Sequence, residues 1–157
     1  MKPLYALAYD LKVYGLPAPQ GSKRHVGKGV MVESSAKVKP WREAVKAAAL
    51  EVRGDRTPLV CPLSVAMTFT FVRPRGHYRS GRNAHLLGTR APIAPATVPD
   101  LSKLLRSTED ALTDAGIWRD DALVAEYLRA AKVWANEGLE SLDVPGAVIR
   151  IYTMEVA

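Results

Sequence analysis

The sequence predicts an α+β fold in which two main helices pack on one face of a mixed β-sheet, within a single domain spanning residues 1–157. Two segments carry apolar residues at helical spacing, and several others have the alternation or apolar run of a strand. The elements follow one another in the order β-β-α-β-α-β-β, with no internal repeat. Of the 157 residues 48% are hydrophobic, which is enough for one sizeable core.

The first half of the chain is predicted to hold two short strands and a helix. Residues 11–16 alternate weakly and 30–32 form a second strand candidate, on either side of a loop rich in Pro, Gly and Lys. A helix begins at Pro40, which is tolerated in a first turn, and it continues to Arg53 before Gly54 ends it. Its apolar residues recur at helical spacing: Trp41, Val45, Ala48, Ala49 and Val52.

The second half holds the clearest strand, over residues 64–73, and the second helix, over residues 101–115. The strand places Val65, Met67, Phe69 and Phe71 on one face and Ser64, Ala66, Thr68 and Thr70 on the other. The helix, which Gly116 is expected to end, has a broad apolar face. That face holds Leu101, Leu104, Leu105, Thr108, Ala111, Leu112 and Ala115. Asp100, Lys103, Ser107, Asp110 and Asp114 fall on the opposite side, with Arg106 at the edge. Residues 122–133 and 147–156 are predicted to be two further strands.

Positive charge is concentrated in particular segments of the chain. The net charge is +6 and the isoelectric point is about 9.6, which favours a nucleic acid or another anionic partner over generic basicity. Residues 56–99 contain no acidic side chain, but they contain Arg56, Arg73, Arg75, Arg79, Arg82 and Arg90. No apolar run approaches the length of a membrane span, and the lone Cys61 is typical of a reducing compartment. We therefore expect a cytoplasmic protein with no membrane partner.

A connection of about 25 residues, 74–98, joins the clearest strand to the second helix. Loops of this length are usually functional or disordered. This one mixes arginines with His77, Tyr78 and His85 and then becomes rich in proline. A solvated linker is one interpretation. The combination of cations and aromatic rings favours a loop that contacts nucleic acid.

Carboxylates flank the second predicted helix at both ends. Asp100 precedes it, and Asp120 and Asp121 follow it. Mg²⁺ binds a few carboxylates and completes its shell with water and phosphate oxygens, so these residues are candidate ligands for a phosphodiesterase metal. A helix of about 15 residues is about 22 Å long, so Asp121 reaches Asp100 only if the chain folds back after the helix.

Each carboxylate also has a purely structural interpretation. Asp100 is a favourable N-cap residue, the Asp120–Asp121 pair suits an exposed turn, and Asp110 and Asp114 can pair with Lys103 and Arg106. The loop histidines lack zinc-ligand spacing. The sequence contains no G-x-x-x-x-G-K-[ST], G-x-S-x-G or G-x-G-x-x-G motif, so no nucleotide cofactor is expected.

The stretch PDLSKLLRSTEDALTDAGIWRDDALVAEY resembles the signature of RusA-type Holliday-junction resolvases, which are often encoded by phages or prophages. That signature is roughly D-x-D-[NK]-x-x-[KR]-x-x-x-D-A-L, followed by a glycine, an aromatic residue and D-D-x-x-V. GLPAPQGSKRHVGKG, VKPWREAV and RPRGHYRSGRN resemble the family's basic loop, first helix and second basic stretch. The resemblance extends over nearly the whole chain.

The resemblance implies an endodeoxyribonuclease that resolves four-way junctions as a homodimer, with Mg²⁺ as cofactor and Mn²⁺ as a possible substitute. The family's first metal-binding aspartate falls on Asp100 and the third on Asp121, with Asp120 beside it; its catalytic lysine falls on Arg106. Its second aspartate falls on Ser102, a neutral residue that should weaken the cation site. The expected DNA contacts are Lys23, Arg24, Lys28, Arg73, Arg75, Arg79, Arg82 and Lys103.

Three functional hypotheses follow from the sequence. The first is a Mg²⁺-dependent, structure-selective endonuclease. The second, motivated by Ser102, is a protein that binds branched DNA and cleaves it poorly or not at all. The third is a basic interaction module whose acidic residues serve only as caps and turns.

Overall fold

The computed structural model describes residues 1–21, 23–25, 27, 31–33 and 36–157. A four-stranded mixed sheet forms its centre, in the strand order β1-β6-β4-β5. Strands β4 and β5 are parallel, whereas the β1–β6 and β4–β6 pairs are antiparallel. The strands are β1 (Pro3–Tyr14), β4 (Leu63–Phe71), β5 (Val124–Trp134) and β6 (Gly146–Val156). The predicted α+β class is thus confirmed.

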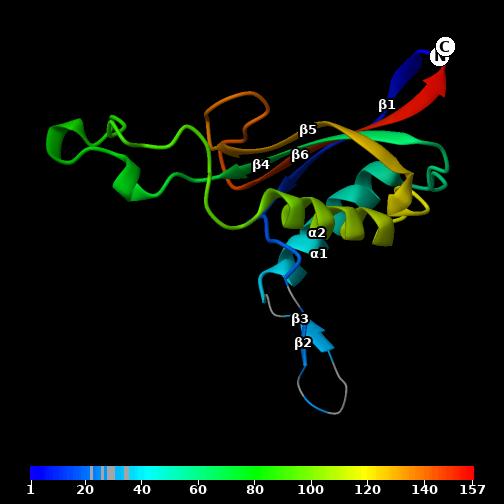
Figure 1. Cartoon of the computed structure of the whole chain (residues 1–157), viewed down its shortest axis with the longest axis horizontal. Coiled ribbons are helices and arrows are strands. Elements are labelled where there is room, and N and C mark those ends of the chain that lie inside the picture. The colour runs from blue at the N-terminus through cyan, green and yellow to red at the C-terminus, as the bar shows by residue number, and fades with distance from the viewer. Residues whose placement is uncertain (22, 26, 28–30, 34–35) are drawn as a thin grey trace.

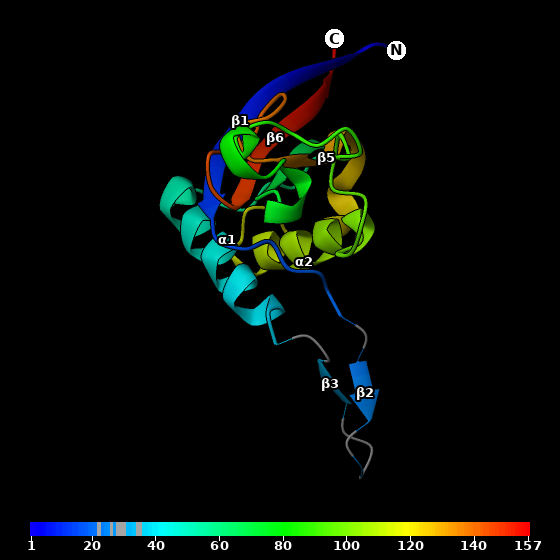
Figure 2. The same ribbon diagram turned by 90° about the vertical axis from the view of Figure 1, so that its left-hand side faces the viewer.

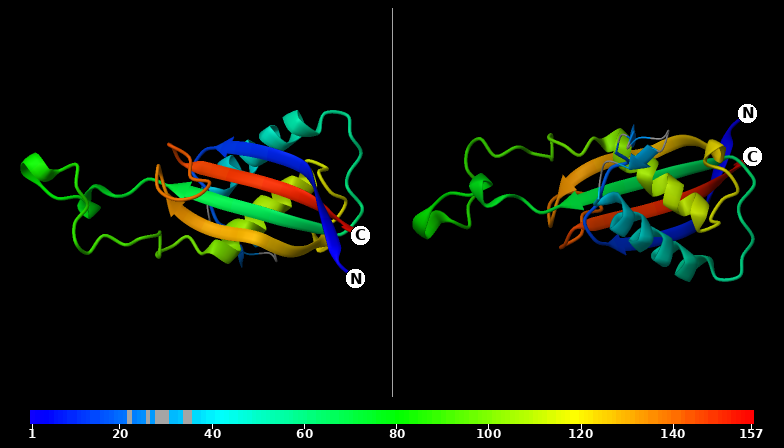
Figure 3. Two further views of the ribbon diagram at one scale, coloured as in Figure 1. Left: turned by 90° about the horizontal axis from the view of Figure 1, so that it is seen from above. Right: turned by 90° about the horizontal axis from the view of Figure 1, so that it is seen from below.

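Two helices, α1 (Val38–Arg53) and α2 (Leu101–Asp114), lie side by side on the same face of the sheet, as Figure 3 shows from above and below. Helix α1 buries Val38, Trp41, Val45 and Ala49, a spacing that places them on one stripe against the sheet and α2. Both helices begin within two residues of the predicted positions. No helix in the described part of the chain is both long enough and apolar enough to cross a membrane.

Strand β4 is one of the two inner strands of the sheet, and both of its faces are buried. The predicted apolar face packs under the helices, with Val65, Met67 and Phe69 fully covered. The opposite face is covered too, although it carries hydroxyl groups. Thr68 Oγ1 accepts a hydrogen bond from Arg129 Nε at 3.0 Å, and Thr70 Oγ1 accepts one from the backbone N–H of Leu142, also at 3.0 Å. Neighbouring elements therefore supply donors to these two hydroxyl groups, whereas the buried Ser64 Oγ of the same strand has no hydrogen-bond partner among the described residues.

One residue of α2 departs from the predicted pattern. Ser107, expected on the polar side, is fully buried, and its hydroxyl donates to the carbonyls of Ala18 and Leu104 at 2.6 and 3.1 Å. The segment that follows β1 therefore covers a face of α2 that the sequence pattern assigned to solvent. The predicted helix stop is confirmed, since Gly116 adopts a left-handed φ of 72° just past the helix end.

Strand β1 begins at Pro3, well before the predicted residues 11–16. Its early residues are mostly exposed and show little alternation, but they pair with β6 from Pro3 opposite Val156 onward. A second, two-stranded sheet is formed by β2 (Lys23–His25) and β3 (Met31–Glu33), and it projects away from the helices (Figures 1 and 2). Strand β3 overlaps the candidate at 30–32, whereas β2 was predicted as loop.

We predict that Thr108→Val destabilises the fold by about 1–3 kcal/mol. The buried Trp41 indole N–H of α1 donates to Thr108 Oγ1 of α2 at 3.1 Å. Valine keeps the volume of threonine but removes the acceptor, which leaves a buried donor unpaired. Urea unfolding of the two proteins measures the difference. Exposed Thr97→Val is the control, and an equal effect of the two substitutions would contradict the role assigned to this hydrogen bond.

Candidate functional site

Asp100 stands immediately before α2 in an extended conformation, with a half-exposed carboxylate. That carboxylate makes no capping hydrogen bond to the helix and lies 3.7 Å from Lys103 Nζ. The backbone around it is fixed from the sheet, because Lys132 Nζ donates to the carbonyls of Thr97 and Pro99 at 2.8 and 2.9 Å. Asp100 is therefore held in place by its backbone while its side chain is left open to solvent.

Asp120 and Asp121 lie beyond the other end of α2, where a short 3-10 turn (Asp121–Leu123, η3) leads into β5. A hydrogen bond from the backbone N–H of Ala122 at 2.8 Å, and one shared with Asp121, lower the pKa of Asp120. The same shared hydrogen bond raises the pKa of Asp121, and the negative charges of Asp120 and Asp110 raise it further. The pair thus behaves as two crowded carboxylates.

Two acids of α2 face this pair. Burial raises the pKa of Glu109, and the charges of Asp121 and Asp110 add to the rise, against a hydrogen bond from the Tyr127 hydroxyl that lowers it. We call Glu109, Asp110, Asp120 and Asp121 the acidic cluster. Glu109 is not among the metal ligands that the sequence predicts. Its proximity to Asp121 arises because β5 returns alongside α2 and brings Tyr127 over Glu109.

Asp100 does not belong to the acidic cluster. Helix α2 has 14 residues and is therefore about 21 Å long. Between Gly116 and Asp121 the chain does not return to the Asp100 end of α2. Turn η3 lies beyond the C-terminal end of the helix, and β5 starts there (Figure 1). One chain consequently keeps Asp100 and Asp121 apart, contrary to the single pocket that the sequence predicts. Within the described ranges, no three His, Cys, Asp or Glu side chains are grouped closely enough to hold a metal ion.

The connection between β4 and α2 extends away from the sheet with two 3-10 turns, Arg75–His77 and Gly81–Asn83 (Figure 1). Arg75, Arg79, Arg82 and Arg90 are exposed, and a cavity of about 470 Å³ is lined by Arg75, Tyr78 and Arg79 with neighbouring small residues. Of the other predicted DNA contacts, Lys103 is exposed on α2, and Lys23 and Arg24 lie in β2. Lys28 lies outside the described residues.

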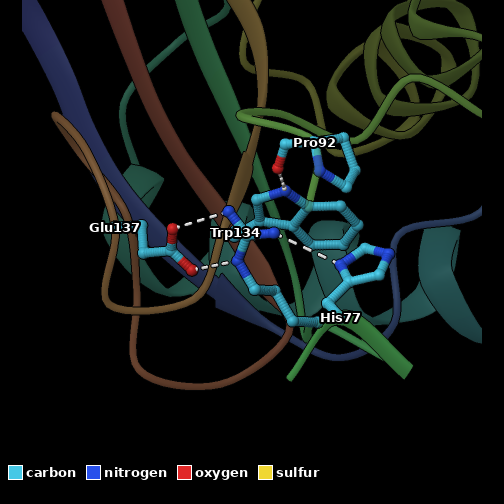
Figure 4. Close-up of polar contacts among 5 residues, drawn as sticks. His77, Pro92, Trp134 and Glu137 are labelled. Atoms are coloured by element: carbon cyan, nitrogen blue, oxygen red, sulfur yellow. Dashed lines mark hydrogen bonds and ion pairs between the residues drawn. The ribbon is translucent and has the colours of Figure 1, made fainter. Parts of the chain in front are cut away.

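Arg73 differs from the other arginines of this segment, and its expected role as a DNA contact is corrected. Its guanidinium is buried at the root of the loop, where it pairs with Glu137 and lies over the Trp134 ring at 5.0 Å (Figure 4). It also contacts His77 Nδ1 at 3.2 Å, and the Trp134 indole N–H donates to the carbonyl of Pro92 at 3.1 Å. We call these five residues the loop anchor, since they fasten both ends of the connection to the end of β5.

The chain matches the family model of endodeoxyribonuclease RusA over residues 15–144. The chain belongs to the RusA endodeoxyribonuclease family. The match confirms the resemblance noted in the sequence and supports an endodeoxyribonuclease that resolves Holliday junctions, with branched DNA as its substrate. A comparison with curated proteins found no match.

The RusA signature thus maps onto both ends of α2. Ser102 and Arg106, which stand at the family's second aspartate and its lysine, are both exposed on the first two turns of the helix. Arg106 also lines a cleft with Asp110. The hydroxyl of Ser102 leaves the Asp100 end with one carboxylate where the signature has two.

In this RusA-family protein we predict that Glu137→Gln loosens the long connection and destabilises the fold by about 1–2 kcal/mol. The ion pair with Arg73 lowers the pKa of Glu137, so its contribution is present above the carboxyl's unfolded pKa and is lost as pH falls through the lower folded value. The expected cost is below that of a fully buried pair, because the Glu137 carboxylate is partly exposed.

Hydrogen exchange over residues 74–98 and urea unfolding at neutral and acidic pH measure both effects. The matched control is Glu140→Gln. Glu140 lies on the same loop as Glu137, and its substitution removes one ion-pair partner of Arg150 and leaves the loop anchor intact. A wild-type advantage over Glu137→Gln that persists unchanged in strong acid would show that the carboxylate charge is not the stabilising element.

Proposed function

We propose that this protein resolves four-way DNA junctions by Mg²⁺-dependent, paired phosphodiester cleavage. The observation that carries the proposal is the acidic cluster at Asp121, a position that matches a metal-binding aspartate of the RusA signature. Carboxylates that lie so close together that the pKa of one of them is raised are a favourable environment for a divalent cation. The cations of the long connection and of the β2–β3 hairpin are proposed to hold the DNA phosphates around it.

The donor chemistry of these residues suits Mg²⁺, which prefers carboxylate oxygens. Mn²⁺ is proposed as a substitute, since it takes the same donors. A bound Mg²⁺ would activate water and neutralise charge on the leaving oxygen. One chain, however, offers Asp100 and Asp121 at opposite ends of α2, so each end alone has an incomplete set.

A homodimer supplies the missing set. If a two-fold axis relates two copies with their α2 helices antiparallel, the Asp100 end of one helix lies beside the Asp121 end of the other. Two equivalent sites result, and a four-way junction with approximate two-fold symmetry presents two equivalent strands to them. We propose this shared arrangement as the active form.

The shared site predicts that Asp100→Asn and Asp121→Asn are each inactive but that a mixture of the two regains nicking. In a mixed dimer one site keeps both aspartates, whereas the other loses both. Cleavage of a labelled synthetic junction in Mg²⁺ measures this, and binding in EDTA should survive in every case, because the DNA contacts are elsewhere. We expect each mixed dimer to make one nick per junction, and, because random exchange makes about half of the dimers mixed, we expect the mixture to reach up to about a quarter of the wild-type nicking rate per dimer.

Asp55→Asn, at an exposed turn after α1, is the control for loss of a surface carboxylate. Retained cutting by Asp121→Asn would refute the metal role of the acidic cluster. If both single variants are inactive and their mixture shows no recovery after co-refolding, the two aspartates do not form a site shared between two chains.

A second candidate function is favoured by Ser102. With a neutral side chain where the family signature has an aspartate, the Asp100 end holds a cation less strongly, and the protein then acts mainly by binding branched DNA. An origin in a phage or prophage and a site of action on DNA in the bacterial cytoplasm are proposed for either function.

We predict that Ser102→Asp increases junction nicking at limiting Mg²⁺ by at least tenfold, because a second carboxylate strengthens cation binding at the Asp100 end. The assay runs wild type and variant side by side over a Mg²⁺ series and without metal. Thr57→Asp, just past the exposed turn after α1, controls for added negative charge. If Ser102→Asp brings no gain at any Mg²⁺ concentration, position 102 does not limit the reaction.

A further inference from the structure

Helix α1 carries a row of cations that the sequence patterns did not single out. Lys39, Arg42 and Lys46 follow one another at intervals of three and four residues, so they share one stripe of the helix. Lys39 and Lys46 are exposed. The stripe lies beside the buried one formed by Trp41, Val45 and their neighbours, about a quarter turn around the helix.

The stripe borders an open cleft of about 520 Å³ between α1 and α2. From α2 the cleft is lined by Arg106, Asp110 and Asp114. The first turns of α1 meet the second half of α2 here, as the bonds from Trp41 to Thr108 and from Arg42 to Asp114 show. Figure 3 shows the two helices side by side. Cations of two separate elements therefore face one solvent-filled space.

These cations are available to a ligand. Among the residues that the structure describes, neither Lys39, Lys46 nor Arg106 forms an ion pair. Arg42 pairs with Asp114 at 2.9 Å, but both side chains are substantially exposed, at 33% and 54%. An exposed pair of this kind is weak, so a phosphate can replace the carboxylate at little cost. Glu43 also lines the cleft, so four cationic and three carboxylate side chains line it in all.

The location of the cleft connects two parts of the proposed DNA path. In the chain, helix α1 begins at Val38, after the β2–β3 hairpin that ends at Glu33 and carries Lys23 and Arg24 in β2. On the other side, Asp110 lines the cleft and also acts electrostatically on Asp121. A DNA backbone in the cleft would therefore pass from the basic hairpin to the acidic cluster.

We propose that the α1–α2 cleft is a phosphate-binding subsite in which Lys39, Arg42 and Lys46 hold the DNA backbone next to the acidic cluster. The proposal rests on the proposed function for its ligand, DNA. It adds contacts that are independent of metal and of cleavage. Because phosphates are common to all DNA, the subsite contributes affinity for junctions and linear duplexes alike.

The test compares Lys39→Gln/Lys46→Gln with Lys2→Gln/Lys12→Gln, an equal loss of charge away from the cleft. Lys12 alternates with the buried Leu11 and Val13 of β1 and so points away from the helices. Binding of a labelled four-way junction and of a linear duplex is measured in EDTA over a NaCl series. Each lost phosphate contact lowers the slope of log affinity against log salt by about 0.7–0.9. We expect a fall of about 1.4–1.8 for the cleft variant, on both DNAs, and little change for the control.

Asp114→Asn gives a gain-of-binding test, because it frees Arg42 and removes a negative charge from the cleft. We expect tighter binding and a slope steeper by about 0.7–0.9. Equal slopes for the two lysine variants, or no gain from Asp114→Asn, would overturn the subsite even if the wild type cuts junctions in Mg²⁺. A wild type that binds no DNA in EDTA would overturn the subsite, whereas the absence of cutting despite binding would count against the proposed nuclease alone.

Discussion

A single rigid helix separates the two carboxylates on which the proposed chemistry depends. Fourteen residues of α-helix impose about 21 Å between the Asp100 end and the Asp121 end of α2, and side chains cannot span that distance. The direction of β5 follows from the same constraint, since the strand must begin where the helix and its turn finish. A metal site that used both ends would therefore have to draw on two copies of the chain, so under the proposed function self-association is part of the chemistry.

The long connection is held by a different principle. Its arginines repel one another and find no acid within residues 56–99, so hydrogen bonds such as those from Arg79 to Leu86 and Leu87 hold the loop internally, but no ion pair forms within it. The loop anchor stabilises both ends of the connection. Arg73 forms an ion pair with Glu137, beyond β5, and the Trp134 indole N–H donates to the carbonyl of Pro92. With both ends fastened to the sheet, the remaining cations can stay exposed and project toward a polyanion.

Most of the fold could be predicted from local patterns, and the departures share a cause in tertiary contacts. Both helices were predictable because apolar spacing and a terminal glycine agree at α1 and α2. The burial of Ser107 depends on the carbonyl of Ala18, 89 residues away in sequence, and the early part of β1 depends on the C-terminal strand. Nor could the candidate site be predicted as one pocket, because the signature gives the spacing of Asp100 and Asp121 along the chain but not the direction in which the chain turns after Gly116.

Charge segregation explains how one small surface can both attract and process a polyanion. The acidic cluster alone would repel a phosphodiester; burial raises the pKa of Glu109 and the hydrogen bond with Asp120 raises the pKa of Asp121, and the neighbouring negative charges add to both rises. If the protein acts as proposed, the cations of α1, the hairpin and the long connection hold the DNA, and a divalent ion relieves the repulsion between the bound phosphate and the carboxylates. Under the proposed function, DNA binding precedes and is separable from metal-dependent cutting, and the neutral Ser102 reduces the charge available to the ion while leaving the DNA grip unchanged.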